Sequence, residues 1–256
     1  NYEGSITTKE FTITKRKITI VAFNASKTYD GIPLTSSKFE ISSGTLAPGQ
    51  TISVTTSGSI TNVGTEINKI STYAIYMNSE NVTKNYDVTT KDGKLEVLPA
   101  SITGTVTITG TNKVGSTLVA LVNVTPADAD LTYSWYYNDA NSTNGGTLIV
   151  TETEGKYVIG SNTSVDLVGK YIYVVVTATK DNHKTQTFTD ITDKDTNGSD
   201  TVRRVITSFD VTLDNDKFEY DGTPKTPNVT VKAENTELVE GTDYELIYDN
   251  NKDAGT

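Results

Sequence analysis

The sequence has no cysteine and only one histidine, one tryptophan and one methionine among its 256 residues. Without cysteine the chain has no thiol nucleophile, no thioester bond and no cysteine-ligated zinc site. Small secreted domains of eukaryotes usually carry disulfides, so their absence favours either a reducing compartment or a bacterial exterior where cysteine is avoided. No apolar run approaches the length of a membrane-spanning helix, so we expect no membrane insertion in this segment.

Positive charge is also scarce. The chain has 22 lysines and arginines against 32 aspartates and glutamates, which gives a net charge of −10 and a pI near 4.6. Binding to nucleic acid depends on a basic surface that releases counterions from phosphates, and binding to anionic lipid depends on similar charge. We therefore expect neither partner, and acidity of this kind usually serves solubility.

The sequence shows no pattern of residues typical of catalysis, although its 32 acidic residues would suffice in number for a glycosidase carboxylate pair. Any scheme of the Ser-His-Asp or Cys-His kind would have to use His183, which lies in the polar turn Asp181–Lys184 with no nucleophile elbow nearby. The acidic residues are scattered over turns and solvent faces, and there is no glycine-rich phosphate loop. We expect no catalytic residues, no bound organic cofactor and no enzyme activity.

What the sequence does have is short alternating segments. Threonine, a β-branched residue suited to strands, makes up 46 of the 256 residues. Apolar residues alternate with polar ones in runs of about four to eight residues, bounded by turn-forming residues, as at Ile18/Ile20/Ala22. Lys170–Ala178 is apolar on both faces and is predicted to be a central strand. With no helical stripe present, the pattern predicts an all-β fold of tandem β-sandwich domains.

Two segments repeat at a fixed spacing. Tyr29–Pro33 (YDGIP) recurs 191 residues later as Tyr220–Pro224 (YDGTP), and Val63-Gly64-Thr65 is followed at the same spacing by Ala254-Gly255-Thr256. The Asp-Gly pair predicts a turn in which glycine takes a positive φ. Since the repeat covers both a turn and a later segment, we interpret it as two copies of one β-unit.

The first residues match the end of that unit at a second spacing. Asn1-Tyr2 matches Asn85-Tyr86, 84 residues later, and Phe11 and Ile13 fall on Leu95 and Val97. The expected organisation is 1–14 as the last strand or strands of a preceding repeat, 15–99 as a complete β-domain, 100–204 as a middle domain and 205–256 as an incomplete further repeat. We expect the last part to be poorly ordered or to be completed by a neighbouring chain, because its sheet would carry an unpaired edge.

The repeated unit resembles the YDG/MBG-type repeats of bacterial surface proteins. The resemblance rests on Lys-x-Tyr-Asp-Gly-x-Pro, the later Val-Gly-Thr, and the closing Asn-Tyr with its final strand, and it covers 15–99 and part of 205–256. It implies a large secreted or wall-attached bacterial protein, often an adhesin, and names no ligand. We interpret Tyr29 and Asp30 as a structural corner, with a ligand-binding role as the alternative.

The middle domain is similar to a bacterial Ig-like sandwich. The resemblance rests on Leu131–Tyr136 (LTYSWY) and on the segment Asp166–Val175, which approaches a tyrosine corner. It departs from antibody domains in lacking the cysteine pair. The resemblance places the indole of Trp135 in the core, and the alternative is a platform for sugar stacking, for which Tyr136 on the opposite face is the better exposed candidate.

One loop has spacing suited to calcium. Asp193, Asp195 and Asn197 stand at positions 1, 3 and 5 of an EF-hand-like loop and glycine follows at position 6, but position 12 is Arg204 rather than glutamate. We expect either a hydrophilic turn or a calcium site that stiffens a domain junction. Calcium is the one metal that the sequence suggests.

The sequence favours a non-catalytic stalk or spacer segment of an extracellular bacterial surface protein, whose neighbours are adjacent repeats of the same protein. The alternative is an adhesin module that binds host or environmental glycans, mucin or matrix protein. A spacer should bury its aromatic residues and have short, stiff junctions, whereas a binder should present an exposed aromatic or polar concavity.

Overall fold

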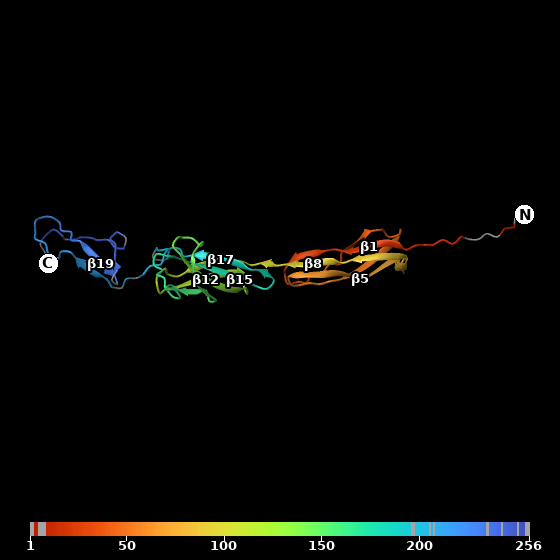
Figure 1. Cartoon of the computed structure of the whole chain (residues 1–256), viewed down its shortest axis with the longest axis horizontal. Coiled ribbons are helices and arrows are strands. Elements are labelled where there is room, and N and C mark those ends of the chain that lie inside the picture. The colour runs from red at the N-terminus through yellow and green to blue at the C-terminus, as the bar shows by residue number, and fades with distance from the viewer. Residues whose placement is uncertain are drawn as a thin grey trace. The chain divides into compact units, whose positions relative to one another are not determined.

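The computed structural model describes residues 3–4, 9–195, 198–204, 206, 208–233, 236–241, 243–249 and 251–253. These residues form strands, turns and coil, and the one helical element among them is a three-residue 3-10 turn, η1 (Thr83–Asn85). No helix in this part of the chain has the length and apolar character that a bilayer crossing requires. The protein is all-β, as the alternating pattern predicts (Figure 1).

The first eight strands make two sheets. The strands are β1 (Arg16–Ala22), β2 (Ala25–Thr28), β3 (Phe39–Ser43), β4 (Gln50–Ser57), β5 (Gly64–Met77), β6 (Glu80–Asn81), β7 (Tyr86–Lys91) and β8 (Gly93–Leu98). One sheet has the order β3-β1-β7, and the other has the order β2-β8-β5-β4 with β6 paired to β5. β1 pairs with β7, and β2 with β8, in parallel.

The core between these sheets is built from one face of β1. Ile18, Ile20 and Ala22 alternate along the strand and are all buried, because successive side chains of a strand point to opposite faces. They cluster with Ile70 and Ile75 of β5 in the facing sheet. Full burial of each isoleucine stabilises the fold by about 1.5–3 kcal/mol, so β1 is a major contributor to this domain.

β5 is longer than the runs of about four to eight residues that the sequence pattern predicts, since it has 14 residues. Its first part, from Gly64 to Asn68, pairs with β8, and the part from Lys69 to Met77 pairs with β4. β5 is long because one strand has to reach both partners. Alternation is a local signal and does not show where partners change.

The next strands form a second pair of sheets. They are β9 (Ala100–Ser101), β10 (Thr103–Thr109), β11 (Thr117–Thr125), β12 (Asp130–Asn138), β13 (Thr147–Glu152), β14 (Lys156–Val158), β15 (Tyr171–Thr179), β16 (His183–Lys184) and β17 (Gln186–Ile191). The sheet orders are β10-β11-β14 and β13-β12-β15-β17, and β16 pairs with β9. Trp135 of β12 and Tyr157 of β14, one from each sheet, are both fully buried, with ring centroids 5.7 Å apart.

β15 is the central strand that the sequence predicts. It lies between β12 and β17, and its consecutive residues Ile172, Tyr173 and Val174 are all buried. A strand covered on both faces is apolar at every position rather than at alternate ones. This explains the unbroken apolar run and confirms the prediction for this segment.

By compactness the chain divides into two units. The first comprises Asn1–Val106, Val122–Tyr133 and Val175–Thr189, and the second comprises Thr107–Leu121, Ser134–Val174 and Asp190–Thr256. Strands β10, β11, β12, β15 and β17 each contribute residues to both units. The side-chain contacts described below lie within one unit or the other.

The last strands belong to the second unit. They are β18 (Asp210–Leu213), β19 (Val229–Ala233) and β20 (Thr236–Glu237), and they form an antiparallel sheet with β19 in the middle. Val231 and Ala233 of β19 are buried, whereas all four residues of β18 are exposed. This sheet therefore buries much less apolar surface than the sheets around β1.

The sequence repeat is also a repeat of backbone hydrogen bonds. The amide of Leu34 donates to the carbonyl of Ile60 over 2.8 Å, and 191 residues later the amide of Lys225 donates to the carbonyl of Asn251 over the same distance. Both pairs tie the segment after the Asp-Gly turn to a distant part of the chain. The two segments thus share tertiary geometry and not only a motif.

The spacing between the two copies changes by one residue before the strand that follows the turn, which is β3 in the first copy and β19 in the second. Phe23 N donates to Lys38 O at 3.0 Å, and Asp214 N donates to Asn228 O at 3.1 Å, so the spacing is 191 residues on one side and 190 on the other. A slip of one residue in pairing would turn every side chain to the other face of the sheet. The second copy is therefore one residue shorter in the loop before β19. The side chains of β19 that face inward are still the counterparts of those of β3.

Candidate functional site

The repeated Asp-Gly pair forms the same turn in both copies. The amide of Ile32 donates to Oδ1 of Asp30, and the amide of Thr223 donates to Oδ1 of Asp221, each at 2.9 Å. The glycine after each aspartate has a φ of 77° in the first copy and 79° in the second. The predicted turn with a positive-φ glycine is confirmed in both places.

A lysine neutralises each of these aspartates. Lys27 Nζ lies 2.6 Å from Asp30 Oδ1, and Lys225 Nζ lies 2.5 Å from Asp221 Oδ2. Mainly through these hydrogen bonds, the pKa of Asp30 is lowered and that of Asp221 is lowered much further, with Thr223 adding to the effect on Asp221. Both carboxyl groups are solvent-exposed, so the ion pairs serve turn geometry more than stability.

The loop predicted as a calcium site is closed by an arginine. Asp195 has a buried side chain whose Oδ2 lies 2.9 Å from Arg203 Nη2, and its Oδ1 accepts from Arg203 Nη1 at 3.1 Å. The amide of Asn112 also donates to Oδ2 at 2.9 Å. These donors engage both oxygens of the carboxylate and tie the loop to Arg203 and Asn112.

Of the other two predicted calcium ligands, Asp193 lies within the described residues. Asn112 Nδ2 donates to the main-chain carbonyls of Asp193 at 2.9 Å and Ser199 at 2.8 Å, so this asparagine holds both ends of the loop. Asn197 lies outside the described residues. Within those that are described, no three acidic or histidine side chains gather where they could hold a metal ion. Calcium binding at Asp193, Asp195 and Asn197 stays a prediction, and an ion there would compete with Arg203 for Asp195.

The aromatic residues weighed as sugar platforms are engaged inside the protein. Trp135 is fully buried, as predicted for a core indole. Tyr136 stacks on Tyr173 with ring centroids 4.8 Å apart and ring planes 5° from parallel, and Tyr173 itself is buried. Burial of the Tyr173 ring raises the pKa of its hydroxyl. Tyr173 therefore occupies one face of the Tyr136 ring.

A junction within the first unit joins the strands around β8 to the turn between β15 and β16. Only Pro99 separates the end of β8 from β9. Asn182, in a left-handed conformation with φ of 64°, contacts both sides: its carbonyl accepts from Ala100 N at 3.0 Å and its Oδ1 accepts from Val63 N at 2.8 Å. Its Nδ2 donates to Asn62 Oδ1 at 3.3 Å.

The histidine and the repeated tyrosine meet at the same junction. The rings of Tyr29 and His183 lie edge to face with centroids 5.7 Å apart. His183 pairs with Ala100 between β16 and β9, and its Nδ1 lies 2.8 Å from the carbonyl of Asp181. These contacts give both residues a structural position, which agrees with the interpretation of Tyr29 as part of a corner.

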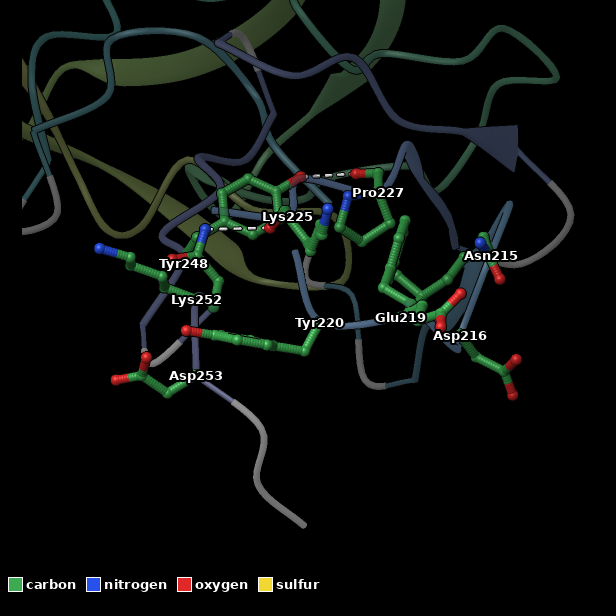
Figure 2. Close-up of a pocket in the computed structure, with 12 residues that line it drawn as sticks. Asn215, Asp216, Glu219, Tyr220, Lys225, Pro227, Tyr248, Lys252 and Asp253 are labelled. Atoms are coloured by element: carbon green, nitrogen blue, oxygen red, sulfur yellow. Dashed lines mark hydrogen bonds between the residues drawn. The ribbon is translucent and has the colours of Figure 1, made fainter. Parts of the chain in front are cut away.

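A groove lies in the second unit beside the end of β18. Its volume is about 480 Å³, and its walls carry Phe218, Tyr220 and Tyr248 together with Lys225. The other charged residues that line it are Asp216, Glu219, Lys252 and Asp253. Figure 2 shows these side chains around the groove, with the hydroxyl of Tyr248 donating to the carbonyl of Pro227 at 2.6 Å. It is an aromatic concavity of the kind expected of a binding surface.

Comparison with known proteins leaves the family open. No protein-family model matches the sequence, and no curated protein matches it. The resemblances to YDG/MBG-type repeats and to Ig-like domains therefore remain proposals for this chain.

The residues that hold the loop and the junction could not be predicted from the sequence. Arg203 and Asn112 meet Asp195 through the tertiary fold, and no local pattern indicates them. Asn182 had a weak signal, because asparagine in a polar turn is the residue that most readily takes a left-handed conformation after glycine. The repeat predicts an unpaired edge in 205–256, but it does not indicate which side chains line the groove, since their exposure depends on which strands pack nearby.

Proposed function

We propose that this segment is a non-catalytic spacer in the stalk of a secreted or wall-attached bacterial surface protein. The observation that carries the proposal is the junction at Asn182. Three hydrogen bonds and an aromatic contact join neighbouring β-structures across a single proline. A spacer has to hold successive domains in a fixed orientation, and such a junction restricts bending and twisting.

The placement of the aromatic residues supports the same proposal. Trp135 and Tyr157 fill the core between two sheets, and Tyr136 is covered by Tyr173. The extracellular bacterial location rests on the resemblance of Tyr29–Pro33 and Tyr220–Pro224 to surface repeats. The absence of cysteine is compatible with it.

The stiffness of the junction can be measured directly. The chain has no native cysteine, so spin labels can be placed only at Thr72→Cys and Asn123→Cys, both exposed positions of the first unit. We expect a narrow distribution of distances between the labels, and a broad one when Asn182→Ala is added. The matched control Asn144→Ala, an exposed asparagine in another turn, should leave the distribution narrow. A broad distribution without Asn182→Ala would contradict the spacer proposal.

The second candidate is an adhesin module, and the exposed aromatic groove favours it. Tyr220 and Tyr248 could stack on sugar rings, with the lysines and carboxylates of the groove fixing orientation. The test is binding of the full chain to immobilised glycans, mucin and matrix proteins, first with calcium and then with EDTA. Saturable binding that Tyr220→Ala abolishes would support this candidate, and loss in EDTA would add support for the predicted calcium loop.

A further inference from the structure

Two segments of the first unit run side by side in the same direction. The first, 16–28, contains β1 and β2, and the second, 86–98, contains β7 and β8. β1 pairs with β7 in one sheet, and β2 pairs with β8 in the other. Both pairings are parallel, so the two segments start at the same end of the domain and finish together at the opposite end. These two segments together are called the parallel ribbon.

The register of the parallel ribbon is the same in both sheets. Each paired residue of β1 lies opposite the residue 70 positions later in β7, as Arg16 lies opposite Tyr86. Each residue of β2 likewise lies opposite the residue 70 positions later in β8, as Thr28 lies opposite Leu98. The ribbon therefore passes from one sheet to the other without a shift of one segment against the other.

The two segments also contact each other where the ribbon passes between the sheets. The amide of Lys94 donates to Oδ1 of Asn24 at 2.7 Å, again across 70 positions. A Cβ on Gly93 would lie 2.5 Å from the carbonyl oxygen of Phe23, so a larger residue would push the segments apart. Nδ2 of Asn68, a fully buried residue of β5, donates to the same carbonyl at 3.1 Å. The contact between the segments is therefore continuous through this point.

Both segments of the ribbon are anchored in the core by apolar side chains. Ile18 and Ile20 of β1 and Leu95 and Val97 of β8 are at most 2% exposed. Sliding one segment along the other would break the backbone hydrogen bonds of the ribbon and would also draw these side chains toward water. Each event raises the free energy, so the two add to the barrier against sliding.

The chain reaches and leaves this domain at opposite ends of the ribbon. It arrives at the start of β1 and departs at the end of β8, as Figure 1 shows. Tension along the chain therefore pulls 16–28 backward along its own axis and 86–98 forward along the same axis. The hydrogen bonds of a parallel pair are evenly spaced, so such a shearing force is shared among them and no single bond has to open first.

We propose that the parallel ribbon makes the domain 15–99 a tension-resisting element, which withstands force applied through the chain by opposing shear between its two segments. Forced unfolding depends on the rate of crossing the unfolding barrier, and in this geometry many contacts have to break together at the barrier. The use of this resistance in a stalk rests on the spacer function proposed above, whereas the resistance itself follows from the pairing.

Pulling the same domain along two axes in optical tweezers tests the proposal. The full chain has no native cysteine, so handles can be attached only where cysteine is introduced. Handles at Lys15→Cys and Ser101→Cys load the ribbon in shear, whereas handles at Lys15→Cys and Lys84→Cys load β1 and β7 from the same end and peel their pairs apart in turn. All three positions are exposed.

We expect unfolding along the shear axis to require several times the force needed along the peeling axis at the same pulling speed. The length of chain released between residues 15 and 101, about 300 Å when fully extended, identifies the event as unfolding of this domain. Similar forces along the two axes would overturn the proposal.

A variant of the contact between the sheets tests the ribbon itself. Along the shear axis, Asn24→Ala should raise the unfolding rate at a given force roughly two- to tenfold, because one hydrogen bond is lost, and Asn24→Asp should restore it by keeping the acceptor. The control Ser71→Ala removes a 3.0 Å hydrogen bond to the carbonyl of Thr55, outside the ribbon, and should leave the rate unchanged. An equal effect of Asn24→Ala and Ser71→Ala would contradict the proposal. Asn24 and Ser71 are exposed, so folding is not at risk.

These outcomes are distinguishable from those of the spacer proposal. The spin labels report the stiffness of the junction at Asn182, whereas the tweezers report the strength of the ribbon. A narrow distance distribution together with equal forces along the two axes would leave the spacer proposal standing and overturn this one. A broad distribution together with a high force along the shear axis alone would do the reverse.

Discussion

The two copies of the repeated unit share their turns but differ in how much apolar surface they bury. Ile18, Ile20 and Ala22 of β1 are at most 2% exposed, whereas Phe209, Val211 and Leu213, their counterparts in and before β18, are 64%, 52% and 47% exposed. The backbone hydrogen bonds around the Asp-Gly turn are nevertheless the same. The turn is set by local sequence, and burial is set by the strands that pack against it.

The largest expected difference between the copies is in hydrogen exchange. Amides of β1 should exchange only through opening of the whole first domain, whereas those of β18 should exchange through local opening of a sheet with little buried apolar surface. We expect protection in β1 to exceed that in β18 on the order of a thousandfold or more. NMR measures the amide exchange rates of both strands in one sample. Equal protection of β1 and β18 would contradict the idea that the difference in apolar burial makes one copy more stable than the other.

Matched truncations should separate the copies next. Ile20→Ala removes a fully buried side chain and should lower the free energy of unfolding of the first domain by about 2–5 kcal/mol. Val211→Ala, at the corresponding position, should change stability by no more than about 0.5 kcal/mol. Urea unfolding followed through amide signals of residues 16–98 and 208–233 reports each copy separately. A similar loss at both positions would contradict the comparison.

The glycines of the two turns should behave alike. A Cβ at Gly31 or Gly222 meets no tight contact, but both have φ near 78°, so alanine is strained by its backbone alone. Gly31→Ala and Gly222→Ala should each cost about 1 kcal/mol by urea unfolding. Gly44→Ala should cost more, because its Cβ would lie 2.2 Å from the carbonyl of Lys17 as well as at positive φ. Unequal losses at Gly31 and Gly222 would mean that the turns are not equivalent.

The smallest expected effect is on the acid side of the pH range. A carboxyl group whose pKa is lowered by folding adds stability above its unfolded value of 3.8 and loses it as the pH falls through the folded pKa. NMR titration of the carboxyl carbons should give a pKa below 3.8 for Asp30 and a still lower one for Asp221. Lys225→Met should raise the pKa of Asp221, while the control Lys252→Met should not. A pKa of Asp221 at or above 3.8 would contradict the ion pair.

Structural features that depend on neighbouring residues could be predicted from the sequence, whereas features that depend on contacts between distant residues could not. Alternation at Ile18–Ala22 and the apolar run of β15 predicted strand and core positions correctly. A strand buried on one face has apolar residues at alternate positions, and a strand buried on both faces has them at nearly every position, so burial can be predicted from neighbouring residues. The resemblance of the middle domain to an Ig-like sandwich placed Trp135 in the core, where the residue is fully buried.

Tertiary partners could not be predicted in this way. The spacing of Asp193, Asp195 and Asn197 suggests a metal, yet Asp195 meets Arg203 and Asn112, the latter 83 residues away. A loop motif shows which oxygen atoms could bind a metal, but it does not show which hydrogen-bond donors the fold places next to them. The repeat predicts an unpaired edge for 205–256, but which side chains line the groove depends on tertiary packing that the repeat does not indicate.

Asn182 meets two requirements at one position. Glycine would accept the left-handed backbone but offers no side chain, and alanine or serine would be strained there. Aspartate tolerates the backbone and could accept from Val63 N, but it would lose the donor that asparagine offers to Asn62 Oδ1, and glutamine would carry its amide one carbon farther. Asparagine is therefore the residue that fits the backbone and both side-chain hydrogen bonds as they stand. A designer who wants to transfer this junction to other pairs of β-structures should begin with this asparagine in place.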